Sequence, residues 1–237
     1  MEYLDIRDKN GNPTGVIKER PLVHADGDLH GTSHVWIVKK NEKGSYDLLL
    51  QKRSENKDAF PGCYDISSAG HLPAGQDYLT SALRELEEEL GIKAEPEQLH
   101  FMGLHEGKCE EIFYGKPFKN HEISHVYLYS EPINIEELKL QEEEVQEVCW
   151  MDFETCCEKV KSGDKKYCLF PEELKMIKEY LKICFASILF FSINSFIIII
   201  TKKGTATNTF EKYTKNIEHT HKKDVMKYFL FKLSIFK

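Results

Sequence analysis

The segment from Gly70 to Ile92, GHLPAGQDYLTSALRELEEELGI, constrains the fold of this chain more than any other stretch. It opens with a Gly-Pro-Gly loop. Asp77 follows at an N-cap position and Gly91 stands at a C-cap position. Between these caps, apolar residues recur at helical spacing, at positions 79, 82, 83, 86 and 90. The pattern predicts a helix that starts after Asp77, ends before Gly91 and buries one stripe.

The same helix carries four acidic residues in five positions, at 85, 87, 88 and 89, and the next lysine is Lys93. Glu85, Glu88 and Glu89 project from one face at about 100° per residue. Such a run is either a solvated acidic surface or a set of ligands for a divalent cation, because carboxylate oxygens suit Mg²⁺ or Mn²⁺. Gly70 favours the second interpretation, since a glycine lets its backbone carbonyl approach the same point.

These residues resemble the Nudix box, G-x5-E-x7-R-E-U-x-E-E-x-G-U, in which U is aliphatic. The chain departs from this pattern at Gln76, where the box has its first Glu. In the family that Glu supports the loop and the helix, and the later glutamates hold the metal, so the departure predicts weakened or retuned catalysis. The eight matching residues are Gly70, Arg84, Glu85, Leu86, Glu88, Glu89, Gly91 and Ile92.

The pattern of elements along the chain is consistent with this resemblance. Residues 1–20 are typical of a hairpin, residues 23–31 of a loop, and helices are expected over 152–161 and 171–182. Strands that surround two or three helices indicate an α/β (α+β) domain. The resemblance implies a Nudix-type α/β/α sandwich with a mixed sheet over residues 1–182. Strands are expected at 33–38, 46–51, 65–69, 99–104, 112–114, 124–129 and 145–151.

The resemblance implies a pyrophosphohydrolase that cleaves a diphosphate linkage, in a nucleoside diphosphate derivative or a similar small organic diphosphate. Metal ions lower the pKa of bound water and neutralise phosphate charge. We expect Mg²⁺ or Mn²⁺ to be held by Glu85, Glu88, Glu89 and the Gly70 carbonyl. Arg84 is expected to orient the carboxylates through charge-assisted hydrogen bonds, or else to form a surface ion pair.

A general base is expected after the box. Glu122 is the candidate, because it precedes the β-rich run SHVYLY; Glu106, Glu110 and Glu111 are nearby alternatives. Arg53, at the end of a predicted strand and followed by Lys57, is a candidate phosphate ligand. The alternative for both cations is a solvated basic strand end.

Residues 4–38 also resemble the start of isopentenyl-diphosphate isomerases, a branch of the same superfamily. Those isomerases place metal-binding histidines near the positions of His24, His30 and His71, and a catalytic cysteine at the position of Ala69. Because Ala69 offers no nucleophile or acid, we favour hydrolysis over isomerisation. Two alternatives therefore stay open: an isomerase-like enzyme, and a catalytically weak, nucleotide-binding regulatory module, which Gln76 suggests.

The formal net charge of -7 gives no reason to expect binding to nucleic acid polymers. Seven cysteines without a C-x-x-C pair, and a polar N-terminal segment, predict a reduced, cytoplasmic protein. After the domain, residues 183–200 are uncharged and long enough for a membrane anchor. The alternatives are an amphipathic or buried helical extension and an extension without function. Residues 201–237 are Lys-rich and expected to be poorly ordered. A homodimer is left open.

Overall fold

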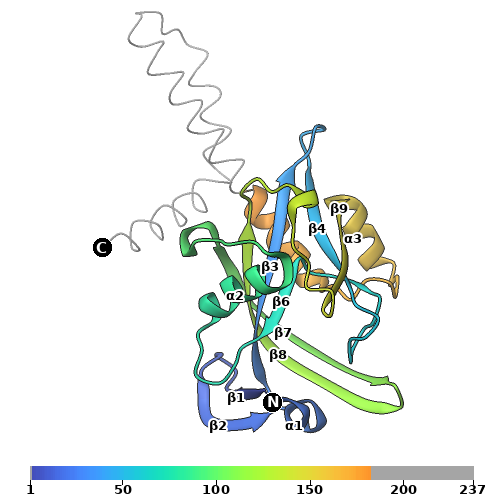
Figure 1. The fold of residues 1–237 in the computed structure, drawn as a ribbon. Coiled ribbons are helices and arrows are strands. Elements are labelled where there is room, and N and C mark those ends of the chain that lie inside the picture. Colours follow the sequence, from blue (N-terminus) through green and yellow to red (C-terminus); the bar gives the residue numbers. More distant parts are fainter. Residues whose placement is uncertain (1, 183–237) are drawn as a thin grey trace, which may run out of the picture. The chain divides into compact units, whose positions relative to one another are not determined.

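The computed structural model describes residues 2–182, and this part of the chain is a mixed α+β fold built on β3 (Figure 1). β3 is the natural centre of the sheet, because nine of its eleven residues are buried. A helix over residues 171–182 follows the last labelled element. The labelled elements are β1 (Tyr3–Arg7), β2 (Pro13–Glu19), α1 (Arg20–Asp26), β3 (His30–Lys40), β4 (Tyr46–Arg53), β5 (Tyr64–Asp65), β6 (Ser68–His71), α2 (Tyr78–Leu90), η1 (Pro96–Gln98), β7 (His100–Phe113), β8 (Lys116–Tyr129), η2 (Ile135–Glu137), β9 (Val145–Asp152) and α3 (Phe153–Lys161).

The sheet is mixed because β3 pairs in parallel with β8 and antiparallel with β1, β4 and β6. β6 and β4 pair with different stretches of β3, residues 32–35 and residues 37–40. Ser67 bridges the point of divergence: its Oγ accepts from the backbone N–H of Ile37 at 2.8 Å and donates to the carbonyl of Leu49 at 2.5 Å. α2 packs against β6 and β3.

Side chains on the two faces of β3 alternate and meet different helices. Val35 and Ile37 belong to a buried apolar cluster that includes Leu86 and Leu90 of α2. Trp36 lies on the opposite face, where it donates a hydrogen bond to Glu173 of the helix over residues 171–182. α3 contacts β4 and β9. The layers are those of an α/β/α sandwich, as expected.

The N-terminal hairpin and the helices over 78–90, 153–161 and 171–182 match the expectations. The expected loop over 23–31 is wrong, because Arg20–Asp26 forms α1, with Pro21 in its first turn and Gly27 as a left-handed C-cap at φ 76°. The two short strands expected at 99–104 and 112–114 are one continuous strand, β7, which forms a long hairpin with β8.

Residues 2–176 belong to one compact unit, and every candidate site residue lies within it. No helix of the described residues has both the length and the apolar character required to span a bilayer. The predictions for 183–200 and 201–237 fall outside the described part of the chain.

Candidate functional site

Helix α2 is fixed at both ends as its caps predict. Asp77 Oδ1 accepts a hydrogen bond from the backbone N–H of Thr80 at 2.9 Å, and Gly91 ends the helix in a left-handed conformation with φ 71°. Leu86 and Leu90 are fully buried against the sheet. The rotation of the helix is therefore set by its apolar stripe, and the acidic face turns toward β6.

Gly70 and Glu85 are in close contact. A Cβ atom on residue 70 would overlap the Glu85 carboxyl group, so glycine is what lets this carboxylate lie against β6. Arg84 holds two acids together: its Nη2 donates to Glu85 and its Nη1 donates to Glu88, both at 2.6 Å. Glu85 is largely buried, and the Glu88 side chain is half exposed. Arg84, Glu85 and Glu88 form one connected group beside Gly70. Together with Glu89 of the same helix we call this group the acid cluster.

Glu89 is the buried acid of the cluster, with 4 % of its surface exposed. Its Oε2 accepts from the backbone N–H of Ala69 at 3.2 Å and from Gln51 Nε2 at 3.5 Å. Burial, followed by the charge of Glu85, raises the pKa of Glu89 to about 8. Burial also raises the pKa of Glu85. The negative charge on each carboxylate is therefore destabilising unless a proton or a cation neutralises it.

The donors in this cluster fit a divalent metal ion. Carboxylate oxygens from consecutive turns of one helix are the hard ligands that Mg²⁺ and Mn²⁺ prefer. A cation site that holds no cation is expected to contain neighbouring carboxylates with raised pKa values, because their charges are not neutralised. Glu85 and Glu89 have this property. Of the residues expected to bind metal, Glu85 lies against Gly70 and is joined to Glu88 through Arg84, and Glu89 follows one helical turn after Glu85. Their role as metal ligands stays a prediction.

The two candidate phosphate ligands lie near this cluster. Lys57 forms an ion pair with Glu144. Its positive charge also partly offsets the rise in the pKa of Glu89. Arg53 donates to Asp65 at 2.8 Å and to the Ala59 carbonyl at 3.1 and 3.0 Å. In this structure Arg53 therefore organises the loop that carries Lys57. A direct role of either cation at a phosphate stays a prediction.

Glu122 lies on β8 directly opposite His30 of β3 and is 6 % exposed. Asn120 Nδ2 donates to its Oε2 at 2.8 Å. His34 Nε2 lies 3.7 Å from its other oxygen. A buried carboxylate with these partners is held in one orientation, as a general base requires.

His34 and Glu173 form a buried pair that sequence reasoning missed. His34 Nδ1 lies 2.7 Å from Glu173 Oε1, and Trp36 Nε1 donates to Glu173 Oε2 at 2.7 Å. The charges of Glu173 and Glu122 outweigh burial and raise the pKa of His34 to about 9. The available signal was a histidine in the expected strand over 33–38, two positions before Trp36 and therefore on the same face.

A second polar cluster is formed by three histidines. His24 Nε2 and His71 Nε2 are 3.2 Å apart, and one ring nitrogen of each of His24, His30 and His71 lies within 4.8 Å of the others. Burial lowers the pKa of all three, that of His24 to about 4. Neutral imidazoles suit borderline metals such as Zn²⁺. The metal-binding role that the isomerase resemblance implies stays a prediction.

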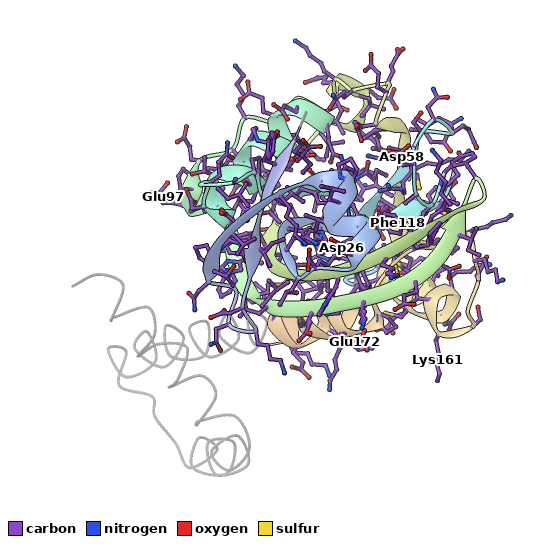
Figure 2. The ribbon with its side chains drawn as sticks, turned by 90° about the horizontal axis from the view of Figure 1, so that it is seen from below. Asp26, Asp58, Glu97, Phe118, Lys161 and Glu172 are labelled. Atoms are coloured by element: carbon purple, nitrogen blue, oxygen red, sulfur yellow. The ribbon has the colours of Figure 1, made fainter. Side chains whose placement is uncertain are left out.

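Helix α1 completes the histidine cluster. It packs on β8, and the His24 ring stacks on Phe118 at a centroid distance of 4.7 Å. In Figure 2, Asp26 marks the end of α1 and Phe118 marks this part of β8. His30 Nε2 has no hydrogen-bond partner among residues 2–182.

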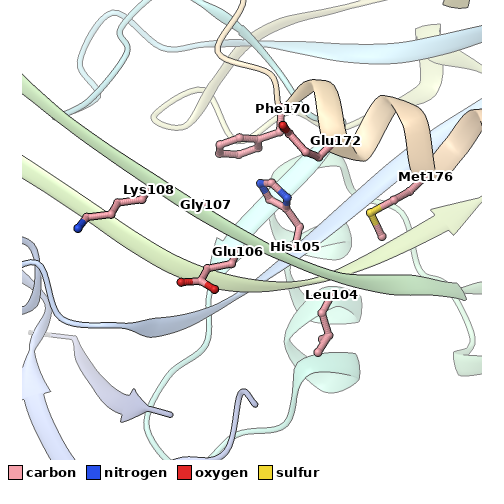
Figure 3. A pocket seen from close by; sticks show the side chains of 8 residues that line it. All are labelled: Leu104, His105, Glu106, Gly107, Lys108, Phe170, Glu172 and Met176. Carbon is pink, nitrogen blue, oxygen red and sulfur yellow. The ribbon is translucent and has the colours of Figure 1, made fainter. Parts of the chain in front are cut away.

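A cavity of about 510 Å³ lies between β7 and the start of the helix over residues 171–182 (Figure 3). His105 points into it, with its ring tilted by 49° against that of Phe170 at a centroid distance of 4.6 Å, and its Nε2 has no partner in the described part of the chain. Beneath the cavity a Cβ on Gly107 would come within 3.3 Å of Glu122, so the candidate base lies close by. The lining residues are Leu104, His105, Glu106, Gly107, Lys108, Phe170, Glu172 and Met176.

Comparison with known proteins extends the similarity beyond the box. Nudix hydrolase 3 of Arabidopsis thaliana is 43 % identical over 155 residues, which is 65 % of this chain and 19 % of the plant protein. An uncharacterized Nudix hydrolase of Clostridium acetobutylicum is 41 % identical over 144 residues, 61 % of this chain and 66 % of the bacterial protein. The chain thus spans less than two thirds of the length of either relative.

The fold is also found in solved structures. The crystal structure of DR0079 from Deinococcus radiodurans matches with a TM-score of 0.54 at 16 % identity, over 73 % of this chain and 98 % of that one. The family model described as the NUDIX domain matches residues 31–169, which is more than half of the chain and includes the complete Gly70–Ile92 segment. The chain belongs to the NUDIX domain family.

Proposed function

We propose that this protein is a divalent-metal-dependent hydrolase of a diphosphate linkage in a nucleoside diphosphate derivative or a similar organic diphosphate. The observation that carries the proposal is the acid cluster: Glu85 and Glu89 are buried side by side at the glycine turn. Both have raised pKa values. The hydrolase names of the curated relatives support the same reaction class.

Each residue has a proposed role. Glu85, Glu88 and Glu89 would hold Mg²⁺ or Mn²⁺, and the bound ion would supply neutralisation of phosphate charge and a lower pKa for a water molecule. Arg84 holds the carboxylates of Glu85 and Glu88 in a fixed relative position through its two hydrogen bonds. Glu122, oriented by Asn120, accepts the proton of the attacking water.

The test is phosphate release from a substrate panel by wild type, Glu88→Gln and Glu87→Gln, with Mg²⁺ or Mn²⁺. The panel covers nucleotide sugars, dinucleoside polyphosphates, oxidised nucleotides, NADH, coenzyme A and prenyl diphosphates. Glu87 is the matched control because it lies on the same helix and pairs with exposed Lys93. We expect Glu88→Gln to lower kcat about 100-fold, or about 2.7 kcal/mol, and Glu87→Gln to leave it unchanged. Equal turnover by the wild type and Glu88→Gln would contradict the metal assignment.

The two alternatives are separated by the same panel. Conversion of a prenyl diphosphate into its double-bond isomer, without phosphate release, would indicate isomerase-like chemistry, which Ala69 disfavours. Binding of a nucleotide without turnover would indicate a regulatory module. The hydrolase names of the relatives favour neither alternative.

A further inference from the structure

Two cysteines far apart in the sequence, Cys63 and Cys168, lie side by side where the chain entering β5 meets the segment before residue 171. The backbone N–H of Tyr64 donates to the Lys166 carbonyl at 2.7 Å, and that of Cys168 donates to the Tyr64 carbonyl at 3.0 Å. The rings of Tyr64 and Tyr167 stack at 5.5 Å. This short parallel bridge holds the two segments in a fixed register.

The two thiols are free, and their side chains are close enough to perturb each other's ionisation. Cys168 Sγ also lies 3.3 Å from the Tyr64 carbonyl, and Cys63 Sγ lies 3.5 Å from the Lys165 carbonyl. The interaction with Cys168 lowers the pKa of the Cys63 thiol to about 7, and the same interaction raises the pKa of Cys168. Burial raises the pKa of Cys149 and Cys156 instead.

We propose that Cys63 and Cys168 form a peroxide-sensitive dithiol site that closes to a disulfide. The Cys63 thiolate attacks one oxygen of a hydroperoxide, the O–O bond breaks, and the other oxygen leaves as water or alcohol after taking up a proton. Cys63 is now a sulfenic acid. The Cys168 sulfur attacks the Cys63 sulfur, the S–S bond forms, and hydroxide leaves with the Cys168 proton as water. Two thiols are oxidised and one peroxide is reduced.

The site is tied to the loop that carries Lys57. The Cys63 carbonyl accepts from the backbone N–H of Arg53 at 2.9 Å, and Gly62 N–H donates to the Arg53 carbonyl at 3.2 Å, so Arg53 and Cys63 form the base of this loop. A bond between Cys63 and Cys168 fixes that base to a second segment. The modification would therefore act on the position of Arg53 and Lys57.

The test is peptide mapping of the full-length protein after treatment with hydrogen peroxide. Trypsin releases Cys63 within residues 58–84 and Cys168 within residues 167–175, and neither peptide contains another cysteine. We expect these two peptides to be joined in the oxidised wild type and separated by dithiothreitol. Because more of it is thiolate at pH 7, Cys63 should react about tenfold faster than Cys149.

Variants Cys63→Ser and Cys168→Ser should both lose the joined peptide, and Cys149→Ser should keep it. In Cys168→Ser, dimedone should label Cys63 as the sulfenic acid. If one variant folds poorly, the joined peptide in the wild type still tests the disulfide, because that measurement needs no variant. The proposal is overturned if the folded wild type gives no joined peptide while peroxide is consumed, or if Cys149 is oxidised as fast as Cys63.

Discussion

At the scale of single residues, Glu89 is where burial and charge conflict most. Its carboxyl has a pKa of about 8 in the fold, against 4.5 for an unperturbed glutamate. The folded state thus binds a proton that the unfolded chain has already released. Without metal, the free energy of unfolding should fall by a few kcal/mol as pH rises from about 4.5 to 8, measured by urea denaturation across this range.

Glu89→Gln should reduce this fall in stability, because the amide does not titrate, and leave the smaller loss above pH 6.5 that His34 causes. Added Mg²⁺ should restore stability to the wild type at pH 8, since a ligand that binds only the folded state stabilises it. Glu87→Gln, exposed on the same helix, should change neither result. A metal-free wild type whose stability does not depend on pH between 5 and 8 would contradict the burial of an uncompensated carboxylate.

Gln76 is the one departure from the box. Its side-chain oxygen accepts a hydrogen bond from Ser81 Oγ at 3.1 Å, so it joins the glycine loop to α2 without a charge. Gln76→Glu should raise kcat about tenfold, or about 1.4 kcal/mol, by restoring the charged acceptor that the box has at this position, where it supports the glycine loop and α2. Gln146→Glu, which adds the same charge at an exposed position of β9, is the control. An unchanged rate in Gln76→Glu would show that the departure is neutral.

At the scale of elements, the His34–Glu173 pair joins β3 to the helix over residues 171–182. The folded pKa of His34, about 9, lies above its unfolded value of 6.5. This pair therefore contributes stability that is complete below pH 6.5 and is lost as pH rises through 9. Glu173→Gln should lower the free energy of unfolding at pH 6 by about 3 kcal/mol, with a smaller loss at pH 9.5, as measured by chemical denaturation.

Glu172→Gln is the matched control, because Glu172 is exposed on the neighbouring position of the same helix. It should stay within about 0.5 kcal/mol of the wild type at both pH values. An equal loss for Glu173→Gln at pH 6 and pH 9.5 would mean that packing, and not the charge of His34, accounts for the effect.

Local signals explain which elements could be predicted. α2 was predictable because its caps, its apolar stripe and its acidic face all lie within residues 77–91. α1 was missed because seven residues give no clear periodicity, although Pro21 and Gly27 mark its ends. The long β7–β8 hairpin was read as short strands, since polar residues such as Glu110 interrupt its alternation in solvent.

The candidate site divides in the same way. Glu85, Glu88 and Glu89 are close in sequence, so helical geometry alone brings them together. His34 and Glu173 are separated by 139 positions, and Cys63 and Cys168 by 105, and only the sheet pairing and the helix over residues 171–182 join them. Contacts of this kind depend on tertiary structure, which no local pattern specifies.

At the scale of the whole molecule, the NUDIX match ends at residue 169 and every residue assigned a role precedes residue 174. A chain that ends at residue 182 should therefore fold and keep its turnover within about twofold of the full chain. Membrane fractionation of the two chains tests the hydrophobic segment over 183–200 separately. If it is an anchor, the full chain should pellet with membranes and the shorter chain should not, because eighteen uncharged residues suffice to span a bilayer. A full chain that stays in the supernatant without detergent would exclude the anchor. Loss of turnover in a folded shorter chain would assign the C-terminal residues a role in catalysis.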